Sequence, residues 1–105
     1  MTSTIWKYLV ELEEPFYRDI PGHAVFRAVL FQQSERAKSV STSVSMWFQV
    51  DPLSKVETRK FVVYATGEEF DASDKEYLGT FAVNDYIMHL YEVVDLSKDL
   101  FWGKQ

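Results

Sequence analysis

The chain has 105 residues, a formal net charge of -5 and no cysteine. Its length corresponds to one domain, and a composition of 47% hydrophobic and 26% charged residues is ordinary for a soluble globular protein. The negative charge argues against direct binding of nucleic acid, and the missing cysteine excludes disulfides and cysteine-based metal or nucleophilic sites. Without a signal-peptide pattern or an apolar run of membrane-spanning length, the expected location is the cytoplasm.

The N-terminal third of the chain reads as three strands. Residues 5–13 alternate between apolar and polar side chains, which is the pattern of a strand with one buried face. A short strand over residues 16–20 is closed by Pro21-Gly22, a strong turn signal. Residues 24–33 are apolar almost throughout, which favours a strand that is buried on both faces or central in its sheet.

The next segment combines a polar stretch with the clearest strand of the chain. The serine-rich residues 34–43 are predicted to form a mobile hairpin loop. Residues 44–50 then alternate, with Met46, Phe48 and Val50 on one face and Ser45, Trp47 and Gln49 on the other. Trp47 is the exception on the polar face, and a large exposed aromatic there favours contact with another protein.

The C-terminal half continues the same pattern. Strands are predicted over residues 58–66, 76–83 and 86–94, the last two joined by the tight turn Asn84-Asp85. Strict alternation places Tyr77 on the same face as Phe81. Residues 68–75 form an acidic loop, and residues 95–105 form a C-terminal extension in which a short helical turn is expected.

Seven short strands separated by turns, without a long amphipathic helix, predict an all-β fold. The expected architecture is a single antiparallel sandwich or small barrel. One domain is expected over residues 1–105, with residues 5–94 as its core.

The chain lacks the residue patterns of an enzyme or a metal protein. His23 lies in a turn and His89 inside the last strand, and neither belongs to a Ser-His-Asp arrangement. The acidic residues 68–74 do not have the spacing of a calcium-binding loop. We therefore predict no catalytic residue, no metal and no cofactor.

Binding is better supported, and four residues are candidates for it: Trp47, Arg59, Tyr77 and His89. Aromatic rings suit a protein interface or stacking on a planar ligand, and Arg59 suits an anion beside them. Two alternatives stay open, in which the rings cover the second face of a sheet or form a homodimer seam.

Several short motifs occur in a fixed order along the chain. They are Ile5-Trp-Lys-Tyr8, Ile20-Pro-Gly-His-Ala24, Met46-Trp-Phe-Gln-Val-Asp-Pro52, Arg59-Lys-Phe61, Ala65-Thr-Gly67, Tyr77-Leu-Gly-Thr-Phe81 and His89-Leu-Tyr-Glu92. In this order they resemble a family of small uncharacterised proteins of tailed bacteriophages and prophages. The resemblance implies no activity and no catalytic residue. It implies a context, since small phage accessory proteins often bind and block host components.

The function expected from these observations is that of a non-catalytic, phage-type accessory protein. It would bind a host component as a homo-oligomer, with a counter-defence inhibitor of a host protein as the first hypothesis. One alternative is the sequestration of a nucleotide defence signal by an oligomeric β-domain. The other is a virion-associated or purely structural module.

Overall fold

The computed structural model describes residues 2–36 and 39–94 and forms seven strands there. They are β1 (Thr4–Leu9), β2 (Phe16–Pro21), β3 (Val25–Arg36), β4 (Ser39–Val50), β5 (Val56–Ala65), β6 (Lys75–Val83) and β7 (Tyr86–Val93). The predicted all-β fold of about seven strands is therefore confirmed. The helical turn expected in the extension lies outside the described residues.

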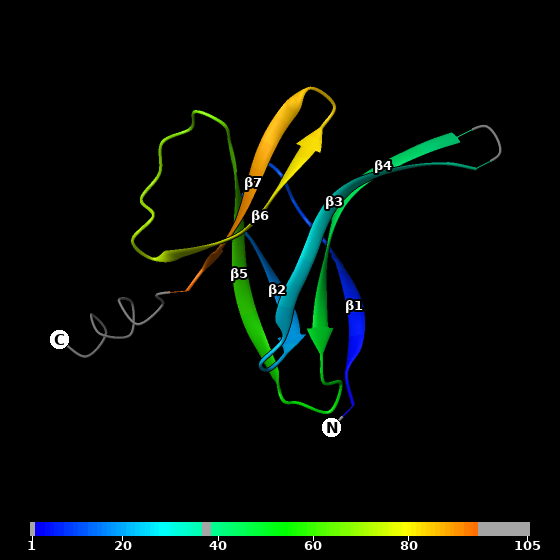
Figure 1. Cartoon of the computed structure of the whole chain (residues 1–105), viewed down its shortest axis with the longest axis vertical. Helices are drawn as coiled ribbons and strands as arrows, with labels where there is room; N and C mark the ends of the chain where they lie inside the picture. Colours follow the sequence, from blue (N-terminus) through cyan, green and yellow to red (C-terminus); the bar gives the residue numbers. More distant parts are fainter. Residues whose placement is uncertain (1, 37–38, 95–105) are drawn as a thin grey trace.

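Two antiparallel sheets make a small β-sandwich. One sheet has the strand order β1-β4-β3 and the other has the order β2-β5-β7-β6, as Figure 1 shows. Strand β3 approaches β6 closely at Gly79, where a Cβ atom would lie 3.0 Å from Val29 Cγ1. Glycine at this position therefore permits a close approach of the two sheets.

The core lies between the sheets and follows from the alternation of the strands. Its largest fully buried side chains are Phe48, Phe61, Ile20, Met46, Leu90 and Val50. The Phe48 ring meets Phe26 and Phe61 edge-on, at centroid distances of 5.6 and 5.9 Å. Met46, Phe48 and Val50 thus form the predicted buried face of β4, because the pleat directs every second side chain inward.

The prediction of a hairpin over residues 34–43 is right, but its description as a loop is wrong. Strands β3 and β4 continue through most of it as a paired ribbon, from Gln32↔Ser43 out to Arg36↔Ser39. In Figure 1 this hairpin projects past the other strands. Its polar composition was misleading because the backbone pairing of two strands does not require an apolar face.

The first strand is shorter than predicted. Pairing between β1 and β4 ends at Leu9↔Ser45, although the Val10 amide still donates to the Val44 carbonyl oxygen at 2.9 Å. The chain then leaves this sheet and reaches β2 in the other sheet, starting at Phe16. The apolar residues Val10 and Leu12 therefore fit the predicted alternation, but they lie outside β1.

Tyr77 lies on the opposite face from the one predicted. The register of β6 against β7 shifts between Tyr77 and Gly79, which is a β-bulge. A bulge adds one residue to one strand and reverses the alternation beyond it. Phe81 therefore points into the core, while Tyr77 is 54% exposed on the outer surface and packs edge-on against Tyr91.

Candidate functional site

The outer face of the three-stranded sheet is unusually apolar for a surface. Alternation and register place nine residues on it, which we call the Trp47 face: Ile5, Lys7, Leu9, Val25, Ala28, Leu30, Ser45, Trp47 and Gln49. Ile5, Leu9, Val25 and Leu30 are each about half exposed. Exposed apolar side chains gathered on one sheet face are typical of an interaction surface.

The charges at the Trp47 face are positive, although the chain as a whole is acidic. Lys7 is exposed and pairs in register with Trp47. Arg27, at the bulge of β3, donates from Nε and Nη2 to Gln49 Oε1 at 3.0 and 2.6 Å. None of the nine residues of this face carries a carboxylate. This face is therefore complementary to an apolar surface that bears acidic groups.

Ser45 lies at one end of this face and is fully buried, between Leu9 and Leu30 in register. Its Oγ has no hydrogen-bond partner in the part of the chain that the structure describes. A buried hydroxyl without a partner costs about 1–3 kcal/mol.

We expect Ser45→Ala to raise the free energy of unfolding by about 1 kcal/mol, because alanine removes the unpaired hydroxyl. Urea denaturation followed by circular dichroism measures it. Ser43→Ala is the matched control, since Ser43 lies on the same face of β4 but is partly exposed, so its hydroxyl is accessible to solvent. A loss of stability in Ser45→Ala would contradict the expectation.

Thr80 links Tyr77 to His89 on the outer face of the other sheet. Tyr77 Oη lies 2.6 Å from Thr80 Oγ1, which lies 2.9 Å from His89 Nδ1. On the other side of the ring, His89 Nε2 lies 2.9 Å from Thr66 Oγ1, which donates its proton to the Ile87 carbonyl oxygen. His89 Nε2 is therefore the donor to Thr66, and both ring nitrogens are engaged in positioning the side chain.

A stacked aromatic cluster continues this surface. Tyr64 and Phe70 stack with ring centroids 3.9 Å apart, and Tyr91 meets Tyr64, Phe70 and Tyr77 edge-on. The rings thus contact one another and cover the outer face of the four-stranded sheet. This geometry matches the alternative in which the aromatics serve packing.

Arg59 points between the two sheets. Its Nε and Nη2 atoms each donate to a Glu92 carboxylate oxygen at 2.6 Å, and Nη1 donates to the Ala24 carbonyl oxygen at 3.1 Å. Its guanidinium also lies over the Phe48 ring, 4.9 Å from the centroid. The hydrogen bond to Glu92 raises the pKa of Arg59, opposed by burial. Arg59 therefore serves an internal ion pair.

The four predicted binding residues do not form one site. Trp47 lies on the outer face of one sheet, Arg59 lies inside the sandwich, and Tyr77 and His89 lie on the outer face of the other sheet. Only Tyr77 and His89 are brought together. An aromatic platform with Arg59 as its anion anchor is consequently not assembled.

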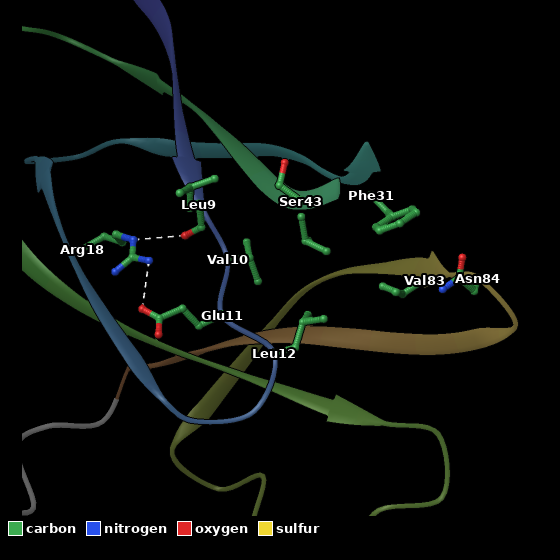
Figure 2. Close-up of a pocket in the computed structure, with 10 residues that line it drawn as sticks. Leu9, Val10, Glu11, Leu12, Arg18, Phe31, Ser43, Val83 and Asn84 are labelled. Atoms are coloured by element: carbon green, nitrogen blue, oxygen red, sulfur yellow. Dashed lines mark hydrogen bonds and ion pairs between the residues drawn. The ribbon is translucent and has the colours of Figure 1, made fainter. Parts of the chain in front are cut away.

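A cavity of about 530 Å³ opens where the chain leaves β1, as Figure 2 shows. Most of its lining is apolar, with contributions from Val10, Leu12, Phe31, Val44 and Val83. Arg18 lies at its edge and is already engaged, donating to the Leu9 carbonyl oxygen and to Glu11, each at 3.1 Å. Sequence patterns missed this cavity because separate segments line it.

In the acidic loop between β5 and β6, the carboxylates of Glu68, Asp71 and Asp74 accept hydrogen bonds from within the loop or from its flanking residues. Glu68 Oε1 accepts from the Ala65 amide at 3.0 Å, and Asp71 Oδ1 accepts from the Ser73 amide at 2.9 Å. A hydrogen bond from Lys75 lowers the pKa of Asp74. Among the described residues, no group of three or more histidine, aspartate or glutamate side chains is placed to hold a metal ion.

Comparison with known families gives one result. Residues 1–99 match the model described as a domain of unknown function, DUF7352. The chain belongs to the DUF7352 family. No curated protein and no solved structure matches it.

The DUF7352 match covers all four predicted binding residues and every strand of the sandwich. It also continues past Val94 into the residues that the strand pattern assigns to a C-terminal extension. Within the described residues, no helix is long and apolar enough to cross a membrane. The family description carries no activity.

Proposed function

We propose that this DUF7352 protein is a non-catalytic binding protein of phage type, which attaches to a protein of the bacterial host in the cytoplasm. The Trp47 face is the observation that carries the proposal. It combines a central tryptophan with four half-exposed aliphatic side chains. Tryptophan and arginine are enriched among the residues that dominate protein interfaces.

The charge of the face defines the chemistry of the partner. Lys7 and Arg27 are the cations at this surface, and its nine residues include no carboxylate. The partner would present an apolar patch with aspartate or glutamate at its rim, since complementary charges favour encounter and register. Inhibition of a host defence protein is the biological role that the phage resemblance suggests.

A protein partner fits the geometry better than a nucleotide signal. Stacking on a base with Arg59 as anchor requires Trp47 or Tyr77 beside that guanidinium. Arg59 is instead engaged by Glu92 inside the sandwich. Because Arg59 does not share a site with Trp47 or Tyr77, the geometry does not support the nucleotide alternative.

We expect Trp47→Ala to weaken binding of the host protein at least about 30-fold, the effect of losing a residue worth about 2 kcal/mol at an interface. The partner is captured from host lysate, identified, purified and titrated by calorimetry. Tyr17→Ala is the matched control, because Tyr17 is 58% exposed on the opposite sheet. Circular dichroism establishes that both variants are folded.

The same titration tests the contribution of the positive charge at the Trp47 face. Lys7→Glu is expected to weaken binding, and the affinity of the wild-type protein is expected to fall as salt rises. Equal affinities of wild type and Trp47→Ala would overturn the assignment of this face. An affinity unchanged by salt and by Lys7→Glu would overturn the acidic character of the partner.

A further inference from the structure

Among the strands of residues 2–36 and 39–94, the part of β4 before Val44 has a paired neighbour on one side only. It pairs with β3 along its whole length, from Arg36↔Ser39 to Val25↔Gln49. Strand β1 pairs with it only from Ser45 to Val50, and the contact between them ends with the Val10 amide donating to the Val44 carbonyl oxygen. Residues 39–43 of β4 therefore present an open strand edge on the projecting hairpin (Figure 1).

The direction of the backbone groups at this edge follows from the ladder. In an antiparallel sheet the N–H and C=O of one residue point to the same side, and successive residues alternate. Because the Val44 carbonyl points toward β1, the backbone groups of Val40 and Thr42 point the same way, past the end of β1. Those of Ser41 point toward Ser34 in β3. Val40 and Thr42 thus offer donors and acceptors to an additional strand.

Within strands β3 and β4 as the structure describes them, this edge lacks the usual protection against pairing. Proteins commonly block open strand edges with charged residues, proline or bulges. Strand β4, Ser39–Val50, contains no charged residue and no proline, and the bulge of the hairpin lies far from the tip at Phe26/Ala28. A strand without charge can also meet its own copy without repulsion, although the chain carries a net charge of -5.

We propose that the occupant of this edge is a second copy of the chain, with the two β4 strands paired antiparallel about a two-fold axis through Ser41. Val40 of one copy then exchanges both backbone hydrogen bonds with Thr42 of the partner subunit, and the reverse pair forms by symmetry. This register pairs the backbone N–H and C=O groups of Val40 and Thr42 that point away from β3. It leaves the hydrogen bond from the Val10 amide to the Val44 carbonyl oxygen in place.

The dimer extends the proposed function without depending on it. A two-fold axis between antiparallel strands is perpendicular to the sheet, so equivalent faces of both copies lie on the same side. The two Trp47 faces then belong to one continuous sheet. A partner protein would meet a larger surface than one three-stranded sheet provides, closer to the area that stable interfaces bury.

A single cysteine tests the register, because the natural chain has none. Opposed residues in a non-hydrogen-bonded antiparallel pair have Cα atoms about 4.5 Å apart, within the range of a disulfide. We expect Ser41→Cys to form a disulfide-linked dimer on mild oxidation. Ser34→Cys, opposite Ser41 on β3, is the matched control and is expected to remain unlinked. Equal linkage of both variants, or none of Ser41→Cys, would overturn the register.

Proline at position 42 tests the edge itself. The Thr42 amide points away from β3, so Thr42→Pro removes a donor of the proposed interface and keeps the β3–β4 pairing. Thr42→Val retains the amide and is the control. By sedimentation equilibrium, we expect the wild type and Thr42→Val to associate from 12.3 kDa to twice that mass. Thr42→Pro is expected to dimerise at least about tenfold more weakly, through lost hydrogen bonds.

The remaining outcomes are also decisive. A wild type that stays monomeric at all concentrations, or a Thr42→Pro variant that dimerises as well as the wild type, would contradict the proposal. A monomeric wild type whose capture of a host protein depends on the Thr42 amide would assign the edge to that protein instead. Trp47→Ala is expected to remain dimeric, which separates failure of the dimer from failure of the Trp47 face.

Discussion

Phe48→Ala is expected to lower the free energy of unfolding by about 4 kcal/mol, within the range of buried phenylalanine truncations. Phe48 is fully buried, and its ring meets Tyr8, Phe26 and Phe61 edge-on. Its removal leaves a cavity at the point where side chains from both sheets meet. Since domains of this size are stable by about 5–15 kcal/mol, much of the total would be lost.

Urea denaturation followed by circular dichroism measures the change in Phe48→Ala. The neighbouring residue supplies the matched control, because Trp47 is only partly buried and lies on the opposite face of the same strand. Trp47→Ala is expected to cost less than half as much as Phe48→Ala. Equal losses in the two variants would mean that the assignment of the faces of β4 is wrong.

Glu92→Ala is expected to lower the free energy of unfolding by about 3 kcal/mol, the lower end of the range for breaking a buried ion pair. The side chains of Arg59 and Glu92 are 21% and 10% exposed. Loss of the carboxylate leaves the guanidinium of Arg59 without its counter-charge. The guanidinium cannot become neutral by releasing a proton, because arginine stays protonated in proteins.

Replacing both partners tests whether Glu92→Ala loses stability because the charge of Arg59 is left unpaired. Replacing both partners, in Arg59→Met with Glu92→Leu, is expected to recover most of the stability that Glu92→Ala loses. Glu11→Ala is the control for a salt bridge at the surface, since it breaks the more exposed Arg18–Glu11 pair and is expected to cost less than about 1 kcal/mol. A Glu92→Ala variant as stable as Glu11→Ala would contradict the prediction.

The internal ion pair was open to prediction only in part. Arg59 stands two residues before Phe61, and Glu92 stands two residues after Leu90, so alternation places each on the buried face of its strand. That pattern was the available signal. The pairing itself depends on the register Phe61↔Glu92 and on the Ala24 carbonyl that completes the contacts of Arg59, and neither can be read from one strand.

The candidate surfaces could also be predicted only in part. Trp47 was predicted to face outward because the alternation of residues 44–50 is regular, and the structure places it there. The aliphatic residues that make its surroundings an apolar face come from β1 and β3, so only strand pairing reveals them. Tyr77 was misplaced because a bulge changes the alternation without a composition signal strong enough to locate it.

By itself, the sequence determined the all-β class, the seven strands and the buried face of β4, because side-chain alternation and turn residues are local properties of the chain. The tertiary structure decided the distribution of strands between two sheets, the ribbon in place of a loop over residues 34–43, and the separation of Trp47, Arg59 and Tyr77. These features depend on which strands pair and in which register. Register is set by contacts between residues far apart in the chain, and a local pattern does not contain them.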